Sequence, residues 1–230
     1  MSSRDAILGR IRASLKSDPA DTARAEAVAL RMKKAPRGII PIRGQLPHAE
    51  KVELFCKMAE KLSATVDRVK NYDAVPKSVA AYLRGRNLPA ALRMGDDKRL
   101  AAMPWDKQRA LQIKHGASDG DDEVGLSHAA TAVAETGTLV LASGRANPTT
   151  INFLPEYHVV VVDAADIEGD LEAALARIRR SFGKGQMPRT VNLISGPSRS
   201  GDIEQTILLG AHGPRSLHVL IVGEAPESAH

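Results

Sequence analysis

Three apolar runs, each of strand length and almost free of polar interruption, constrain the fold of this chain most. They are GTLVLAS at 137–143, YHVVVVDA at 157–164 and SLHVLIVG at 216–223. A strand with one face in water alternates apolar and polar residues, whereas a continuous Val/Leu run is typical of a strand buried on both faces. Such strands belong to parallel sheets that helices cover on both sides.

Helical patterns separate these runs from one another and from shorter strands. The segment GDLEAALARIRRSFG, residues 169–183, predicts an amphipathic helix that leads to a strand at 190–196. The patterns upstream predict helices at 48–62, at 75–86 and from Asp96, and strands at 64–70, 90–94 and 110–116. This alternation predicts an α/β fold with a mostly parallel sheet and helices on both faces.

Residues 1–44 are predicted to form a basic helical arm with a linker, followed by an α/β domain at 45–230. Ser2 or Ser3 can cap a first helix, and a second helical pattern runs from Thr22 to Lys34. The arm holds ten Lys/Arg and four Asp/Glu, whereas the rest of the chain holds 22 and 23. Two interpretations stay open: the arm packs on its own domain, or it docks on a partner or another subunit.

Charge, hydropathy and cysteine content exclude several classes of protein. The net charge of +5 comes from the arm, and the body lacks a basic surface interleaved with aromatic residues, so nucleic-acid binding is not expected. No apolar run approaches the ~18 residues of a membrane span, and the first residues do not resemble a signal peptide. The single cysteine, Cys56, cannot supply the four thiolates of an iron–sulfur cluster. We therefore expect a cytosolic, bacterial-type protein without a cluster of its own.

Ligands of open α/β sheets gather outside the carboxyl ends of the strands, and three polar segments are predicted to lie at or beside such ends. The first segment, ETGT at 135–138, interrupts apolar residues just before the buried part of the strand at 137–143. Burying its carboxylate, Glu135, is costly without hydrogen bonds. Glu135 is therefore a nucleophile, a general base or a ligand for a substrate hydroxyl, or else it caps backbone amides. Its predicted ligand-binding neighbours are Thr136, Gly137 and Thr138.

The second segment is ISGPSRSGDIE at 194–204. A glycine-flanked turn presents backbone N–H groups, and hydroxyls with a guanidinium can complete an anion site. It is not a Walker loop, because the terminal Gly-Lys-Ser/Thr is absent. Asp202 is either an acid–base group or the N-cap of a helix. The predicted ligand-binding residues here are Ser198, Arg199, Ser200 and Glu204.

The third segment, GAHGP at 210–214, places a histidine between glycines. A histidine side chain such as His212 can do acid–base work or bind a carboxylate, and Gly213 is its predicted ligand-binding neighbour. An ordinary structural role for the histidine stays open. The acidic loop at 118–125 lacks EF-hand spacing, and no histidine pair has zinc-ligand spacing, so no metal site is predicted. The loop at 143–150 is predicted to be an ordinary polar loop.

These segments together resemble one family. In order and spacing, AETGTLVL, LPEYHVVVV, SGPSRSGDIEQTILLGAHGP and LHVLIVG resemble the LUD-domain family, in particular its lactate utilization protein C group, over roughly residues 123–223. The resemblance implies the fold shared by CoA transferases, ribose-5-phosphate isomerase and glucosamine-6-phosphate deaminase-like proteins. It also implies a cytosolic component of a system that oxidises L-lactate to pyruvate, in which separate partner proteins carry iron–sulfur clusters.

The resemblance and the residues together support one leading hypothesis, a non-redox subunit of a lactate-oxidising assembly. The subunit would hold no cofactor and would bind a small carboxylate of the lactate or pyruvate class, or organise the cluster-bearing partners. Arg199 would hold the carboxylate, and the catalytic candidates are Glu135, Asp202 and His212. The alternative is a stand-alone enzyme of the same fold that acts on an acyl-CoA or a phosphosugar. A third class is an interaction protein that uses the basic arm.

Overall fold

The computed structural model describes residues 2–16, 21–34, 37–183, 185–201 and 207–223. The chain divides into two compact units, Met1–Ile39 and Ile40–His230. The division falls a few residues before the arm boundary expected at 44. In the part of the chain that the structure describes, no helix combines the length and the apolar character needed to cross a membrane.

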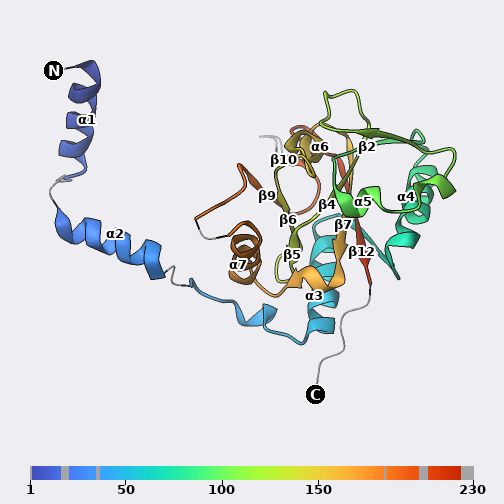
Figure 1. The fold of residues 1–230 in the computed structure, drawn as a ribbon, viewed down its shortest axis with the longest axis horizontal. Helices are drawn as coiled ribbons and strands as arrows, with labels where there is room; N and C mark the ends of the chain where they lie inside the picture. Colours follow the sequence, from blue (N-terminus) through green and yellow to red (C-terminus); the bar gives the residue numbers. More distant parts are fainter. Residues whose placement is uncertain (1, 17–20, 35–36, 184, 202–206, 224–230) are drawn as a thin grey trace. The chain divides into compact units, whose positions relative to one another are not determined.

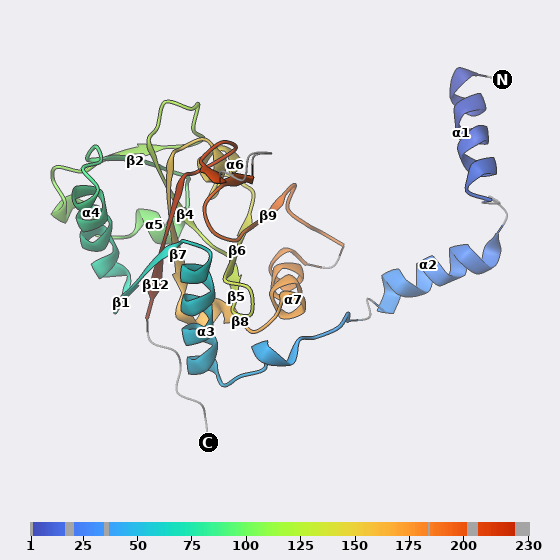
Figure 2. The same ribbon diagram turned by 180° about the vertical axis from the view of Figure 1, so that it is seen from behind.

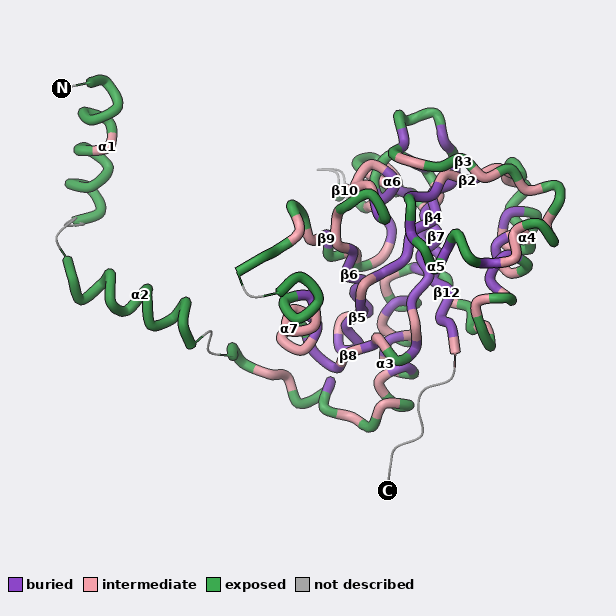
Figure 3. The backbone as a smooth tube through the Cα atoms, viewed as in Figure 1, coloured by how far each residue is buried: buried purple, intermediate pink, exposed green. Residues whose placement is uncertain are grey.

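The first unit holds helices α1 (Ser3–Ser14) and α2 (Thr22–Lys34), as the sequence predicts (Figure 1). Ser2 caps α1: its hydroxyl accepts a hydrogen bond from the Asp5 amide, and the Asp5 carboxylate accepts one from the Ser2 amide. No described residue of either helix is buried (Figure 3). Two large apolar residues of α1, Ile7 and Ile11, are exposed.

The second unit is built on a six-stranded sheet in which every pair of neighbours is parallel. The strand order is β1-β12-β7-β4-β2-β3. The bounds are β1 Thr65–Val69, β2 Ala91–Met94, β3 Gln112–His115, β4 Val124–His128, β7 Tyr157–Asp163 and β12 Ser216–Val222. The two longest strands, β7 and β12, are the apolar runs at 157–164 and 216–223, and they lie side by side. The mostly parallel sheet is confirmed.

Helices pack on both faces of this sheet, which explains the continuous apolar runs. Alternate residues of β7 point to opposite cores: Val160 and Val162 pack with helix α3 (His48–Lys61), whereas Val159 and Val161 pack with helix α4 (Val75–Gly85). Both helices can be followed from the two sides in Figures 1 and 2. The remaining helices are α5 Lys98–Ala101, α6 Thr149–Phe153 and α7 Leu171–Phe182, with short 3-10 turns at Ile42–Gly44, Tyr72–Ala74, Trp105–Lys107 and Ala164–Asp166.

A second sheet of mixed direction lies beside the parallel one, in the order β8-β5-β6-β9. Its strands are β5 Thr131–Val133, β6 Thr138–Ala142, β8 Ile167–Glu168 and β9 Val191–Ile194. Strand β6 is antiparallel to both β5 and β9. The alternation of helices and strands predicted that the runs at 137–143 and 190–196 belong to the parallel sheet. This prediction is wrong, because they form β6 and β9 of the second sheet. They resemble parallel strands because β6 is also buried on both faces, with helix α7 covering Val140.

The segment after β9 continues as a strand. Strands β10 (Arg199–Gly201) and β11 (Ile207–Leu209) form an antiparallel pair. Residues 207–209 are therefore extended and not helical. Asp202 and Glu204 lie outside the described residues.

Candidate functional site

The strand order creates one topological switch point in the parallel sheet. From β2 the chain passes to β3 on one side, and from β4 it passes to β7 on the other. The loops at the carboxyl ends of β2 and β4 therefore leave in opposite directions, which opens a crevice where α/β proteins bind ligands. Asp97 and Arg99 follow β2, and His128 ends β4.

A cavity of about 490 Å³ occupies this crevice. Its charged and polar walls include Asp97, Arg99, His128, Asn147, Asp166 and Arg177, and we refer to it as the carboxyl-edge cleft. Its volume lies within the range that small-molecule sites occupy.

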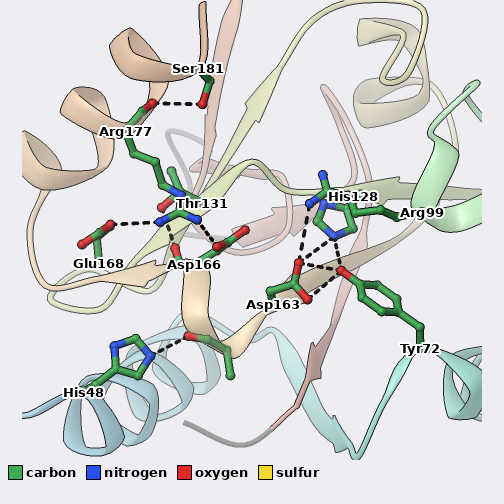
Figure 4. Close-up of polar contacts among 11 residues, drawn as sticks. His48, Tyr72, Arg99, His128, Thr131, Asp163, Asp166, Glu168, Arg177 and Ser181 are labelled. Carbon is green, nitrogen blue, oxygen red and sulfur yellow. Dashed lines mark hydrogen bonds and ion pairs between the residues drawn. The ribbon is translucent and has the colours of Figure 1, made fainter. Parts of the chain in front are cut away.

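Three side chains from distant parts of the chain form a hydrogen-bonded network at the cleft (Figure 4). The Tyr72 hydroxyl donates to Asp163, with its oxygen 2.5 and 2.6 Å from the two carboxylate oxygens. The Nε2 atom of His128 lies 3.1 Å from that hydroxyl oxygen and 3.4 Å from Oδ2 of Asp163. The single hydroxyl hydrogen of Tyr72 is donated to Asp163. The hydrogen in the contact between Tyr72 and His128 must therefore be on Nε2 of His128. Nδ1 of His128 has no hydrogen-bond partner among the described residues; it accepts a hydrogen bond when the imidazole is neutral and donates one when the imidazole is protonated.

The network shifts the pKa values of its acidic members. Burial acts to raise the pKa of Asp163, but the hydrogen bonds from His128 and Tyr72 and the charge of Arg99 bring it below its ordinary value. Burial, together with the neighbouring Asp163, raises the pKa of Tyr72 far above its ordinary value. At neutral pH the network therefore consists of an Asp163 carboxylate and a protonated Tyr72.

Acidification tests this network. Because the pKa of Asp163 is lower in the folded chain than in the unfolded chain, its carboxylate stabilises the fold above pH ~4. That stabilisation is lost as the pH falls through the folded-state pKa. We expect Asp163→Asn to lower the free energy of unfolding at pH 7. The variant should lose less of that free energy on acidification, so that its difference from the parent, measured by urea unfolding, shrinks as the pH falls below ~4. A constant difference between variant and parent at all pH values would contradict the network. Asp122, whose pKa is also lowered, keeps some acid sensitivity in both proteins.

The arginines of the cleft differ in how fully they are paired. Arg177 is bound to Asp166 and lies 3.4 Å from Oε1 of Glu168. Arg99 is about half exposed, and its nearest carboxylate oxygens, on Asp163 and Asp97, lie at 3.5 and 3.7 Å. Neither distance is that of a well-formed hydrogen bond. Arg99 therefore has N–H donors available to an anion.

The sequence-predicted residues gather at another place. Ser198, Arg199, His212 and Gly213 line a cavity of about 290 Å³ together with helix α6 and the first residues of β7 and β12. We refer to this space as the amino-end cavity. His212 and Gly213 precede β12, so they lie at its amino end and not at a carboxyl end as predicted. Ser200 is not among the lining residues.

Arg199 is engaged within the protein. Its Nη2 atom donates to the Leu62 carbonyl and to the Ser63 hydroxyl, both at 2.6 Å, where it binds the carboxyl end of helix α3. This contact leaves its other donors for a ligand. The predicted role of Arg199 in holding a carboxylate stays a prediction.

The Glu135 segment forms the turn between β5 and β6. Glu135 is buried, and one of its oxygens lies 3.5 Å from Nε of Arg43 without a hydrogen bond among the described residues. The hydroxyls of Thr136 and Thr138 are 2.8 Å apart, and Thr138 lies 2.7 Å from the hydroxyl of Ser195, which lines the amino-end cavity. This segment therefore adjoins the amino-end cavity and does not line it.

Sequence reasoning missed the main residues of the carboxyl-edge cleft and of the hydrogen-bonded network beside it. One signal was available for Asp163, because an acid directly after a buried run marks the carboxyl end of a strand. Nothing in the patterns identified His128, because β4 is short and includes Gly125 and Ser127. Arg145 and Asn147, assigned to an ordinary polar loop, line the cleft.

Comparison with known proteins agrees with this architecture. The family model of the LUD domain matches residues 52–222. The chain belongs to the LUD-domain family. Both cavities lie within the matched part of this LUD-domain chain. A crystal structure of a DUF162 family protein from Deinococcus radiodurans superposes with a TM-score of 0.57 at 19% identity, and it covers 77% of this chain and 99% of that one. That likeness supports the fold.

Curated relatives of the LUD-domain chain include lactate utilization proteins C. The one from Shouchella clausii is 30% identical over 120 residues, which are 52% of each chain. The one from Geobacillus thermodenitrificans is 35% identical over 119 residues, 51% of this chain and 49% of the relative. An uncharacterized protein from Neisseria meningitidis is 36% identical over 100 residues, 44% of this chain and 42% of the relative. The chain thus spans about half the length of the curated relatives it matches.

Proposed function

We propose that this LUD-domain chain acts in lactate utilization and binds a small 2-hydroxy or 2-keto carboxylate in the carboxyl-edge cleft. The names of its lactate utilization relatives support the process. The observation that carries the choice of site is the half-exposed Arg99 at the topological switch point, next to a histidine whose Nδ1 atom has no hydrogen-bond partner among the described residues.

The chemistry of the cleft suits such a ligand. A 2-hydroxy acid has a carboxylate that accepts hydrogen bonds and a hydroxyl that donates one. Arg99 supplies N–H donors for the carboxylate, and a planar guanidinium matches a carboxylate with two parallel bonds. The carboxylate of Asp97 on the cleft wall is an acceptor that suits the hydroxyl, and the neutral form of the His128 imidazole offers Nδ1 as a second acceptor.

The proposal includes partners that handle the electrons. Lactate oxidation to pyruvate removes two electrons, and a chain with one cysteine cannot itself supply the thiolates of a four-cysteine cluster. We therefore propose that the chain is a cytosolic, non-redox subunit that works with separate iron–sulfur proteins. Affinity purification of the tagged chain from its host grown on lactate should recover proteins that contain iron and acid-labile sulfide. Their absence from repeated purifications would reject this part of the proposal.

A panel of ligands tests the binding proposal. We expect L-lactate and pyruvate to raise the unfolding midpoint, by roughly 5–10 °C at about 100 times their Kd. Propionate should raise it less, because it lacks the oxygen on carbon 2. Coenzyme A and ribose 5-phosphate belong in the panel because a 490 Å³ cleft has room for larger ligands. A shift with either of these and none with the acids would replace the proposal with the enzyme alternative.

A further inference from the structure

The inner wall of the amino-end cavity includes two fully buried polar side chains, Asn152 and His158. A third buried residue, Ser127, connects them. Its hydroxyl donates to Oδ1 of Asn152 at 3.0 Å, and Nε2 of His158 lies 3.0 Å from the same hydroxyl oxygen. These contacts join β4, helix α6 and the start of β7.

The direction of these hydrogen bonds follows from the hydroxyl. Ser127 has one hydrogen, and it is used on Asn152, so Nε2 of His158 must donate to the serine oxygen. Two atoms are then left over, the amide nitrogen of Asn152 as a donor and Nδ1 of His158 as an acceptor. Neither atom has a hydrogen-bond partner among the described residues. Buried polar groups without partners are rare, so each calls for a bound group that completes it.

Burial keeps this wall uncharged. It lowers the pKa of His158 to about 3, so the imidazole is neutral at physiological pH. The free donor and the free acceptor therefore match a neutral group that both accepts and donates. A hydroxyl is the smallest such group.

The outer part of the cavity has a different character. Arg199 and His212 line it and are exposed, and none of its described lining residues is acidic. Phe153 and Leu193, both about half exposed, add apolar surface. This combination favours an anionic group at the mouth.

We propose that the amino-end cavity is a second binding site, for a small anion that carries a hydroxyl at the end opposite its charge. The hydroxyl bonds to Asn152 and His158 on the buried wall, and the anion faces Arg199 and His212 at the exposed mouth. A 2-hydroxy acid does not fit this description, because its hydroxyl and its carboxylate are on adjacent carbons. The site is therefore distinct in ligand and in location from the one proposed for lactate.

Imidazole nitrogen resonances of ¹⁵N-histidine-labelled full-length protein test the proposal. The probes are 3-hydroxypropionate, which is a positional isomer of lactate, and glycerol 3-phosphate; each is paired with its analogue without hydroxyls, propionate and propyl phosphate. At least one hydroxylated probe should bind and shift the Nδ1 resonance of His158 toward that of a hydrogen-bonded nitrogen. Its analogue should bind roughly tenfold more weakly and leave this resonance in place. Which probe binds tells whether the anion is a carboxylate or a phosphate.

Two variants separate this site from the carboxyl-edge cleft. Asn152→Asp replaces the free donor with an acceptor of the same shape, so it should weaken the binding of the hydroxylated probe at least tenfold. Arg99→Gln should leave the affinity for that probe unchanged. The proposal is overturned if neither hydroxylated probe moves the His158 resonance, or if the analogues bind equally well. It is also overturned if Nδ1 is already hydrogen-bonded in the free protein, because a water molecule would then complete the wall.

Discussion

Replacing Gly137 with alanine is expected to destabilise the fold by about 3 kcal/mol or more. Gly137 adopts a positive φ of 63° in the turn between β5 and β6. A Cβ atom there would lie 2.5 Å from the backbone nitrogen of Ala59 and 2.6 Å from the carbonyl carbon of Met58. Both neighbours belong to the backbone of helix α3, so neither can move without moving the helix away from the core.

Thermal unfolding measures this effect, with Gly85→Ala as the matched control. A Cβ atom at Gly85 would meet nothing within 4 Å beyond its own chain neighbours and the backbone of its helix, and its φ is not positive. Alanine at this place in helix α4 should change stability little or raise it by up to about 1 kcal/mol. We expect the midpoint of Gly137→Ala to fall by roughly 6–12 °C. Equal midpoints for the two variants would show that the turn does not pack on α3 as described.

The sequence predicts local elements well where one physical signal dominates. Helix α2 begins and ends where its pattern does, and α3 and α4 match to within a residue. The second sheet was missed because a short strand buried on both faces has the same apolar pattern whether its neighbours are parallel or antiparallel. Pairing direction depends on contacts between distant segments, such as Leu139 with Ile194.

The candidate site shows the same limit. Tyr72 and Asp163, which share a hydrogen bond, are 91 residues apart, and His128 lies between them in the sequence. No local motif connects them. His128 and Asp163 meet because β4 and β7 are neighbours and end at the same edge of the sheet, and Tyr72 follows β1, which ends at that edge too. Glycine and proline signals did identify the loops that line the amino-end cavity, because turns leave a local signature. The chemical roles of those residues stay predictions.

Arg99→Gln is expected to cause the largest loss of ligand binding. A charge-assisted hydrogen-bond pair to a carboxylate contributes about 1.5–3 kcal/mol, which corresponds to a roughly 10- to 100-fold weaker Kd for L-lactate. Glutamine keeps much of the side chain's length, and the guanidinium of Arg99 is half exposed and no closer than 3.5 Å to a carboxylate oxygen, so the fold should tolerate the change. Arg189→Gln removes the same charge from an exposed loop and should leave the Kd within twofold.

Titration calorimetry of L-lactate into the parent, Arg99→Gln and Arg199→Gln tests the central claim most directly, because each variant removes one arginine from one cavity. If the carboxyl-edge cleft is the lactate site, Arg99→Gln weakens binding at least tenfold and Arg199→Gln leaves it within twofold. Retained binding in Arg99→Gln, with loss in Arg199→Gln, would contradict the account and place lactate in the amino-end cavity.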